Sequence, residues 1–132
     1  MRYLLLLTLA ISLYGGEKFV LIANKNFPLK ELKKEQIKQI YLKKLRFINE
    51  TPIVPINYTP RDPLRKEFEN KILKIPPKRL KRYWMKKHYL GIRPPLTQNS
   101  SKSAILFVKK VDGAIAYIPH SELTQDVKVI YK

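Results

Sequence analysis

The chain of 132 residues is strongly basic, with 27 Lys and Arg against 10 Asp and Glu and a formal net charge of +17. Hydrophobic residues make up 45% of it, which allows a globular core and excludes a chain too polar to fold. With no cysteine, disulfides, thiolate metal sites, a thiol nucleophile and lipoprotein anchoring are excluded. The charge favours anionic partners such as phosphate groups or anionic lipid, although lysines spread along the chain also serve solubility.

The first sixteen residues have the pattern of a secretory signal peptide. Arg2 gives a positive start, residues 4–13 form an apolar run, and two glycines precede the first acidic residue. The apolar run is shorter than the ~20 residues that span a bilayer, which argues against an uncleaved anchor. We therefore expect residues 1–16 to be cleaved and residues 17–132 to form one periplasmic domain, which keeps a charge of +16 after the loss of Arg2.

The first half of this domain is predicted to alternate between strands and helices. Residues 18–23 are an apolar, β-rich run and are predicted to form a buried strand. Residues 29–45 carry an apolar stripe at helical spacing and predict a helix. Residues 53–57 predict a second strand, which Pro55 places at a sheet edge or where one ladder bond is missing.

Two helices are predicted next. Asp62 is a good N-cap and Pro63 suits the first helical position, so a helix is expected from there to Ile75. Another helix is predicted to start at Pro77 and to end before Gly91.

The last third predicts one more helix and two strands. Residues 99–101 are suited to cap a short helix that reaches residue 111, and strands are predicted over 114–118 and 127–131. The order β-α-β-α-α-α-β-β predicts an α/β fold with a small mixed β-sheet flanked by helices.

No catalytic or metal-binding pattern is visible in the sequence. The chain has two histidines and lacks a glycine-rich phosphate loop, an HExxH motif and a GxSxG motif. We therefore expect a binding protein and not an enzyme, with no metal and no cofactor.

The first candidate site is segment 58–65, which follows a predicted strand and enters a helix. Free N–H groups and the helix dipole favour an anion at such a place. Arg61 and Arg65 are suited to bidentate contacts with an oxyanion, and Thr59 adds a further contact. Asp62 either accepts from a protonated oxyanion or caps the helix and blocks the site with its own carboxylate. The predicted ligand-binding residues are Thr59, Arg61, Asp62 and Arg65.

The second candidate site is segment 78–89, which holds six cations and no acidic residue on one predicted helix. Lys78, Arg82 and Lys86 follow at spacings of four, where like charges cost about 0.2–0.5 kcal/mol per pair unless an anion lies between them. Trp84 is suited to stacking on bases or to a membrane interface. The alternative is that the aromatic side chains pack in the core and the cations form a solvated face.

In this order of elements the chain resembles the phosphate ABC-transporter substrate-binding proteins of the type 2 periplasmic binding fold, particularly their short single-domain relatives. The stretches that carry the resemblance are 20–44 (VLIANKNFPLKELKKEQIKQIYLKK), 53–68 (IVPINYTPRDPLRKEF), 82–95 (RYWMKKHYLGIRPP) and 111–118 (VDGAIAYI).

The resemblance implies one lobe of such a protein, which binds phosphate or a related oxyanion and serves a membrane transporter or receptor. Full-length members bind phosphate between two domains, so a single domain implies a weak or partner-completed site. The family's Ser-Gly-Thr loop is replaced here by residues 61–65, and Ala116 stands where the family often has glycine. The alternative is a basic envelope-associated protein that binds polyanions or a partner protein through segment 78–89, without specific nucleic-acid recognition.

Overall fold

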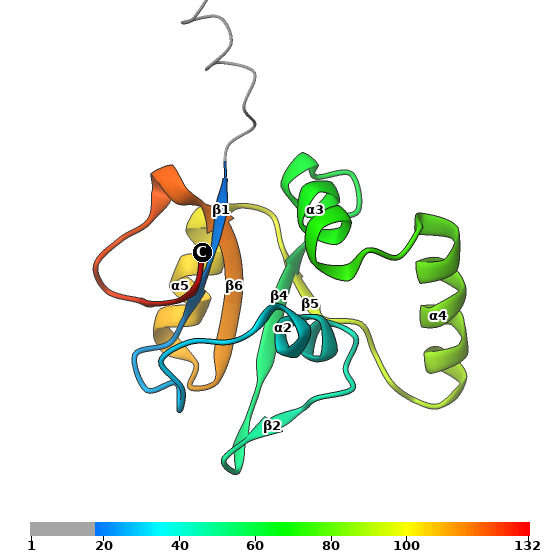
Figure 1. Cartoon of the computed structure of the whole chain (residues 1–132), viewed down its shortest axis with the longest axis horizontal. Coiled ribbons are helices and arrows are strands. Elements are labelled where there is room, and N and C mark those ends of the chain that lie inside the picture. The colour runs from blue at the N-terminus through cyan, green and yellow to red at the C-terminus, as the bar shows by residue number, and fades with distance from the viewer. Residues whose placement is uncertain (1–17) are drawn as a thin grey trace, which may run out of the picture.

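The computed structural model describes residues 18–132, so the predicted signal peptide lies outside the described residues. A five-stranded mixed sheet in the order β5-β4-β6-β1-β7 forms the centre of the molecule, with helices packed on it (Figure 1). The predicted α/β fold class, a small mixed sheet flanked by helices, is confirmed. The strands of this sheet are β1 (Phe19–Ala23), β4 (Val54–Tyr58), β5 (Leu96–Gln98), β6 (Ala114–Pro119) and β7 (Lys128–Tyr131).

The strands of one half of the sheet are parallel and those of the other half antiparallel. β4 runs parallel to its neighbours β5 and β6, whereas β1 runs antiparallel to β6 and β7. β1 is buried along its whole length, as expected for a strand that is covered on both faces.

No helix within residues 18–132 is both long enough and apolar enough to cross a bilayer. The helical segments are α2 (Lys34–Tyr41), α3 (Pro63–Phe68) with its π-helical continuation η1 (Glu69–Leu73), α4 (Pro77–Tyr89), α5 (Ser101–Lys110) and the short 3-10 turn η2 (His120–Glu122).

A cluster of aromatic rings joins the sheet to α2 and α3. The Phe68 ring stacks on the Tyr117 ring of β6, with centroids 4.0 Å apart and planes 3° apart. Tyr41 from α2 approaches Phe68 at 4.7 Å, and Phe19 from β1 meets Phe68 edge-on at 5.6 Å. Tyr58 at the end of β4 meets Tyr117 edge-on at 5.1 Å. The sheet and two helical segments therefore share one aromatic core.

Helix α2 is shorter than the helix predicted over residues 29–45. Before it, the Leu32 N–H donates to the Ile130 carbonyl of β7 at 2.8 Å, which holds this segment against the sheet in a non-helical conformation. After it, Lys43 adopts a left-handed conformation with φ of 63°, which a continuing α-helix does not allow. The apolar spacing was correct for Ile37 and Ile40, which are fully buried, but it extended too far in both directions.

Pro55 does not mark a sheet edge, because β4 lies between β5 and β6. The other prediction, a missing ladder bond, explains why proline is tolerated. The Val54 N–H donates to the Gly113 carbonyl on the β6 side, so the proline nitrogen faces the β5 side. Pairing with β5 begins only at Ile56 and Leu96, so the ladder bond is missing at Pro55 and its lack of an N–H costs nothing there.

The helices after β4 agree with the sequence prediction, but three short strands were not predicted. The predicted helix from Asp62 is α3 with η1, which the left-handed Lys74 ends, and the helix predicted from Pro77 is α4. Strand β5 has only three residues and is defined by its pairing with β4. Strands β2 (Phe47–Ile48) and β3 (Thr51–Pro52) form a separate hairpin between the helix predicted over 29–45 and the strand predicted over 53–57.

Two glycines with positive φ give a matched test of close packing. At Gly113 (φ +80°) a Cβ would lie 2.0 Å from the Pro52 carbonyl oxygen, whereas at Gly91 (φ +76°) it would meet nothing within 4 Å. We expect Gly91→Ala to lower the free energy of unfolding by about 1–2 kcal/mol, the cost of the left-handed conformation alone. Gly113→Ala is expected to cost clearly more, because the backbone must also move. Urea unfolding measures both, and equal losses would contradict the packing at Gly113.

Candidate functional site

The carboxyl ends of β4, β5 and β6 meet at one edge of the sheet, beside α3 at the top of Figure 1. Tyr58 and Gln98 are register partners at the ends of β4 and β5, so the loops that follow them leave the sheet side by side. One loop leads into α3 and the other into α5. Ligands of open α/β sheets bind outside the carboxyl ends of the strands, so this edge, here called the carboxyl edge, is the candidate anion site.

At the start of α3, Asp62 caps its own helix. Its Oδ1 accepts from the Leu64 N–H at 2.9 Å, and its own N–H donates to the Thr59 carbonyl at 3.0 Å. Pro63 at the first helical position has no N–H to offer. Of the two roles considered for Asp62, the structure therefore shows the N-cap. Its carboxylate accepts the hydrogen bond of the Leu64 N–H, which an oxyanion at this helix end would otherwise use.

Arg65 points inward and joins α3 to β4. One Nη donates to the Tyr58 carbonyl at 2.6 Å, and Nε donates to the Glu69 carboxylate at 3.2 Å. Only 16% of its side chain is exposed. Thr59 and Arg61, in contrast, are exposed. The structure therefore places Thr59 and Arg61 at the surface of the carboxyl edge and Arg65 behind it.

The start of α5 adds polar groups that sequence reasoning used only as a cap. The Ser100 Oγ accepts from the Ser103 N–H at 3.1 Å, and the Ser101 side chain hydrogen-bonds to the Tyr58 side chain. The first turn of α5 holds the exposed Lys102 and no acidic residue. The first N–H groups of a helix have no intrahelical acceptor, which favours an anion. Recognising β5 as the strand before α5 would have placed this serine-rich start at the carboxyl end of a strand, and so at the candidate site.

The tyrosines beneath this edge are held neutral. The Tyr58 hydroxyl donates to the Tyr117 carbonyl at 2.7 Å, and the Tyr117 hydroxyl donates to Oδ1 of the buried Asn57. The Tyr41 hydroxyl donates to the Ile56 carbonyl at 2.9 Å. Burial raises the pKa of all three phenols far above the ordinary 10.0, because a phenolate would lose its hydration there. These hydroxyls fix the carboxyl edge and carry no charge to a ligand.

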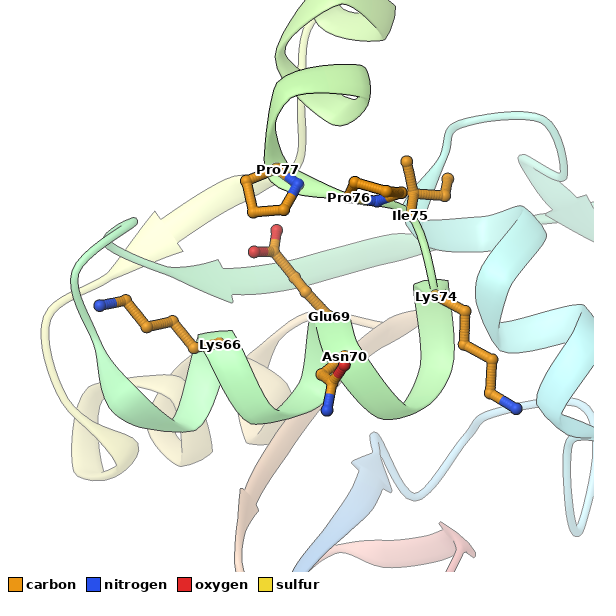
Figure 2. A pocket seen from close by; sticks show the side chains of 7 residues that line it. All are labelled: Lys66, Glu69, Asn70, Lys74, Ile75, Pro76 and Pro77. Atoms are coloured by element: carbon orange, nitrogen blue, oxygen red, sulfur yellow. The ribbon is translucent and has the colours of Figure 1, made fainter.

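A hollow of about 520 Å³ lies between η1 and the start of α4 (Figure 2). The Glu69 side chain points into it, and the side chains of Lys66 and Lys74 extend away on either side. The lining of the hollow carries the Glu69 carboxylate, which is paired with Arg65, and the two cations Lys66 and Lys74. Within residues 18–132, no group of three His, Cys, Asp or Glu could hold a metal ion.

In the second candidate site, on α4, the predicted cations and the predicted aromatic residue lie in different environments. Lys78, Arg82 and Lys86 are exposed on α4, whereas Trp84 is half-buried and lines a cavity of about 230 Å³ together with Arg65. Tyr83 also packs inward, and its hydroxyl donates to the Leu42 carbonyl at 2.6 Å. Tyr83 and Trp84 therefore attach α4 to the body, and Lys78, Arg82 and Lys86 lie on its outer face.

Solved structures show where this fold occurs. A phosphate ABC-transporter substrate-binding protein from Clostridium perfringens, with bound phosphate, matches 86% of this chain and 44% of its own, with a TM-score of 0.71 and 24% identity. The chain has the fold of one lobe of such a protein. An ABC-type phosphate transport receptor from Vibrio cholerae matches 86% of this chain and 45% of its own (TM-score 0.69, 18% identity). PstS from Borrelia burgdorferi matches 87% of this chain and 47% of its own (TM-score 0.68, 8% identity).

The chain spans less than half the length of each of these proteins. No family model matches its sequence, and no curated protein matches it. The resemblance to phosphate ABC-transporter binding proteins is therefore confirmed at the level of fold.

The opposite placement of the two arginines predicts different effects on stability. We expect Arg65→Met to lower the free energy of unfolding by about 1.5–3 kcal/mol, because the Tyr58 carbonyl and Glu69 lose a charged partner. Arg61→Met, at an exposed position, is the control and should stay within about 0.5 kcal/mol of the wild type. Urea unfolding at neutral pH measures both, and similar losses would contradict the inward role of Arg65.

The raised pKa values of the buried tyrosines predict a loss of stability in alkali. Above pH 10 the unfolded chain releases phenolic protons that the folded chain keeps, so the free energy of unfolding falls as the pH rises. This contribution is fully present below pH 10. Tyr41→Phe removes one of these protons, and we expect its unfolding free energy to fall less steeply with pH. Urea unfolding across this range tests it, and parallel profiles for variant and wild type would contradict it.

Proposed function

We propose that this chain is a non-enzymatic, exported module that binds phosphate or a related oxyanion. The observation that carries the proposal is the match of 86% of the chain to half of a protein that holds phosphate. The formal charge of +17 supports an anionic ligand. The proposal includes a signal peptide over residues 1–16 and a periplasmic domain over residues 17–132.

The carboxyl edge is where we place the anion. Arg61 and Thr59 are exposed on the loop before α3, and Lys102 and Ser101 begin α5 beside it. An oxyanion between these loops gains the Arg61 guanidinium on one side and the amides and ammonium of the α5 start on the other. Asp62 and Arg65, which complete the predicted set, act there as a helix cap and as a support for the end of β4.

A second protein surface completes this site in our proposal. The anion at the carboxyl edge would be open to water on one side, and the solved proteins of this fold have more than twice the matched length. The second surface belongs to a membrane transporter, to a receptor or to another copy of this chain. Affinity of the isolated domain is therefore weak, at millimolar ligand.

The test is isothermal titration calorimetry of residues 17–132 with phosphate and with sulfate, at low and at physiological salt. We expect binding that Arg61→Gln with Lys102→Gln weakens by at least about tenfold, equivalent to 1.4 kcal/mol. Arg79→Gln with Lys81→Gln removes the same charge from exposed positions on α4 and is the matched control.

Two results would contradict the proposal: no heat at millimolar ligand in low salt, or equal weakening in the control.

The second candidate function is polyanion binding through Lys78, Arg82 and Lys86, which the exposure of all three on α4 favours. That function predicts heparin binding that falls steeply with salt and disappears when these three are changed to Gln.

A further inference from the structure

A second cationic surface lies at the other end of the molecule from the carboxyl edge. A hollow of about 370 Å³ opens between the segment after α2, the hairpin strand β2 and the loop after α4. Its lining includes Ile53, which precedes the amino end of β4, so it lies at the opposite end of that strand. Strand β2 lies far from α3 at the bottom of Figure 1. We call this the cationic hollow.

Three cations line the cationic hollow and no acidic residue does. They are Lys43, Arg46 and Arg93. The ion pairs formed within residues 18–132 join other residues, so none of these three charges is neutralised by a carboxylate there. Burial and the Arg46 charge both lower the pKa of the Lys43 ammonium, which agrees with crowding of like charges. An anion in the hollow would relieve this repulsion.

Hydrogen-bonded backbone turns carry these cations. The Arg46 Nε donates to the Lys43 carbonyl at 3.3 Å across the left-handed turn at Lys43. On the other side, the Gly91 N–H donates to the His88 carbonyl at 3.0 Å, which closes the end of α4 just before Arg93. The hollow is therefore built from fixed turns on both sides.

Exposed large apolar side chains lie in the lining of the cationic hollow or next to it in the sequence. Phe47 lines it and is 59% exposed, and Leu90, which precedes the lining residue Gly91, is 69% exposed. Tyr89, next to Leu90, is 85% exposed. Exposed large apolar groups beside cations are typical of surfaces that enter the headgroup region of an anionic bilayer. A free phosphate ion or a nucleic acid backbone would leave these apolar groups in water.

We propose that the cationic hollow docks this protein on the surface of an anionic phospholipid bilayer. A lipid phosphate lies between Lys43, Arg46 and Arg93, and Phe47 and Leu90 enter the interface beside it. Docking at this end leaves the carboxyl edge, at the opposite end of β4, free for a ligand and a partner. The proposal is independent of phosphate binding at that edge.

The test is co-sedimentation of residues 17–132, which contain the whole described fold, with vesicles. Vesicles of equal parts phosphatidylglycerol and phosphatidylcholine are compared with phosphatidylcholine alone. We expect binding to the anionic vesicles only. Arg46→Gln with Arg93→Gln should weaken it by at least about tenfold, since each cation at an anionic surface contributes roughly fivefold. Phe47→Ser with Leu90→Ser should weaken it at unchanged charge.

The matched control is Lys78→Gln with Arg82→Gln, which removes the same charge from the outer face of α4. We expect a loss of less than about threefold for it, and no loss for Arg61→Gln with Lys102→Gln. Unfolding temperatures confirm that each variant is folded. Equal loss in the α4 control, no effect of Phe47→Ser with Leu90→Ser, or displacement from vesicles by millimolar inorganic phosphate would overturn the proposal.

Discussion

The burial of the Tyr117 side chain is the constraint on which the rest of the structure depends. Its ring stacks on Phe68 from α3 and meets Tyr58 from β4, and its hydroxyl requires Asn57 as a partner. A buried hydroxyl without a partner costs about 1–3 kcal/mol, so β4, β6 and α3 have one relative arrangement in which all of these groups are satisfied. That arrangement fixes the end of β4, against which Arg65 then holds α3.

Local signals in the sequence predicted the elements whose boundaries are set by their own residues. Helix α4 begins at Pro77 because proline suits a first helical position, and the inward positions of Leu80 and Tyr83 follow from their spacing. Strand β5 escaped prediction because three residues become a strand only by pairing with β4, which lies about 40 residues earlier in the chain. Without β5, the sequence did not place the serine-rich start of α5 at the carboxyl edge.

The candidate site could be predicted in place but not in detail. Segment 58–65 does lie at the carboxyl end of a parallel strand, as its position before a helix indicated. The direction of each side chain was beyond sequence reasoning, because Arg61 and Arg65 are equally basic and differ only in whether the Tyr58 carbonyl lies within reach. The cationic hollow was also invisible, since Arg46 and Arg93 meet only through the folding of distant loops.

The pairing of β1 sets the order in which this molecule can be completed. Phe19 is the register partner of Pro119, and Leu21 is that of Tyr131, so the first strand finds both of its neighbours only near the end of the chain. Contacts this far apart in sequence close large loops and form late. A chain synthesised from its amino end therefore lacks its central strand pairs until residues 114–131 exist. Until then β1 has unpaired edges and exposed apolar side chains that other proteins can bind.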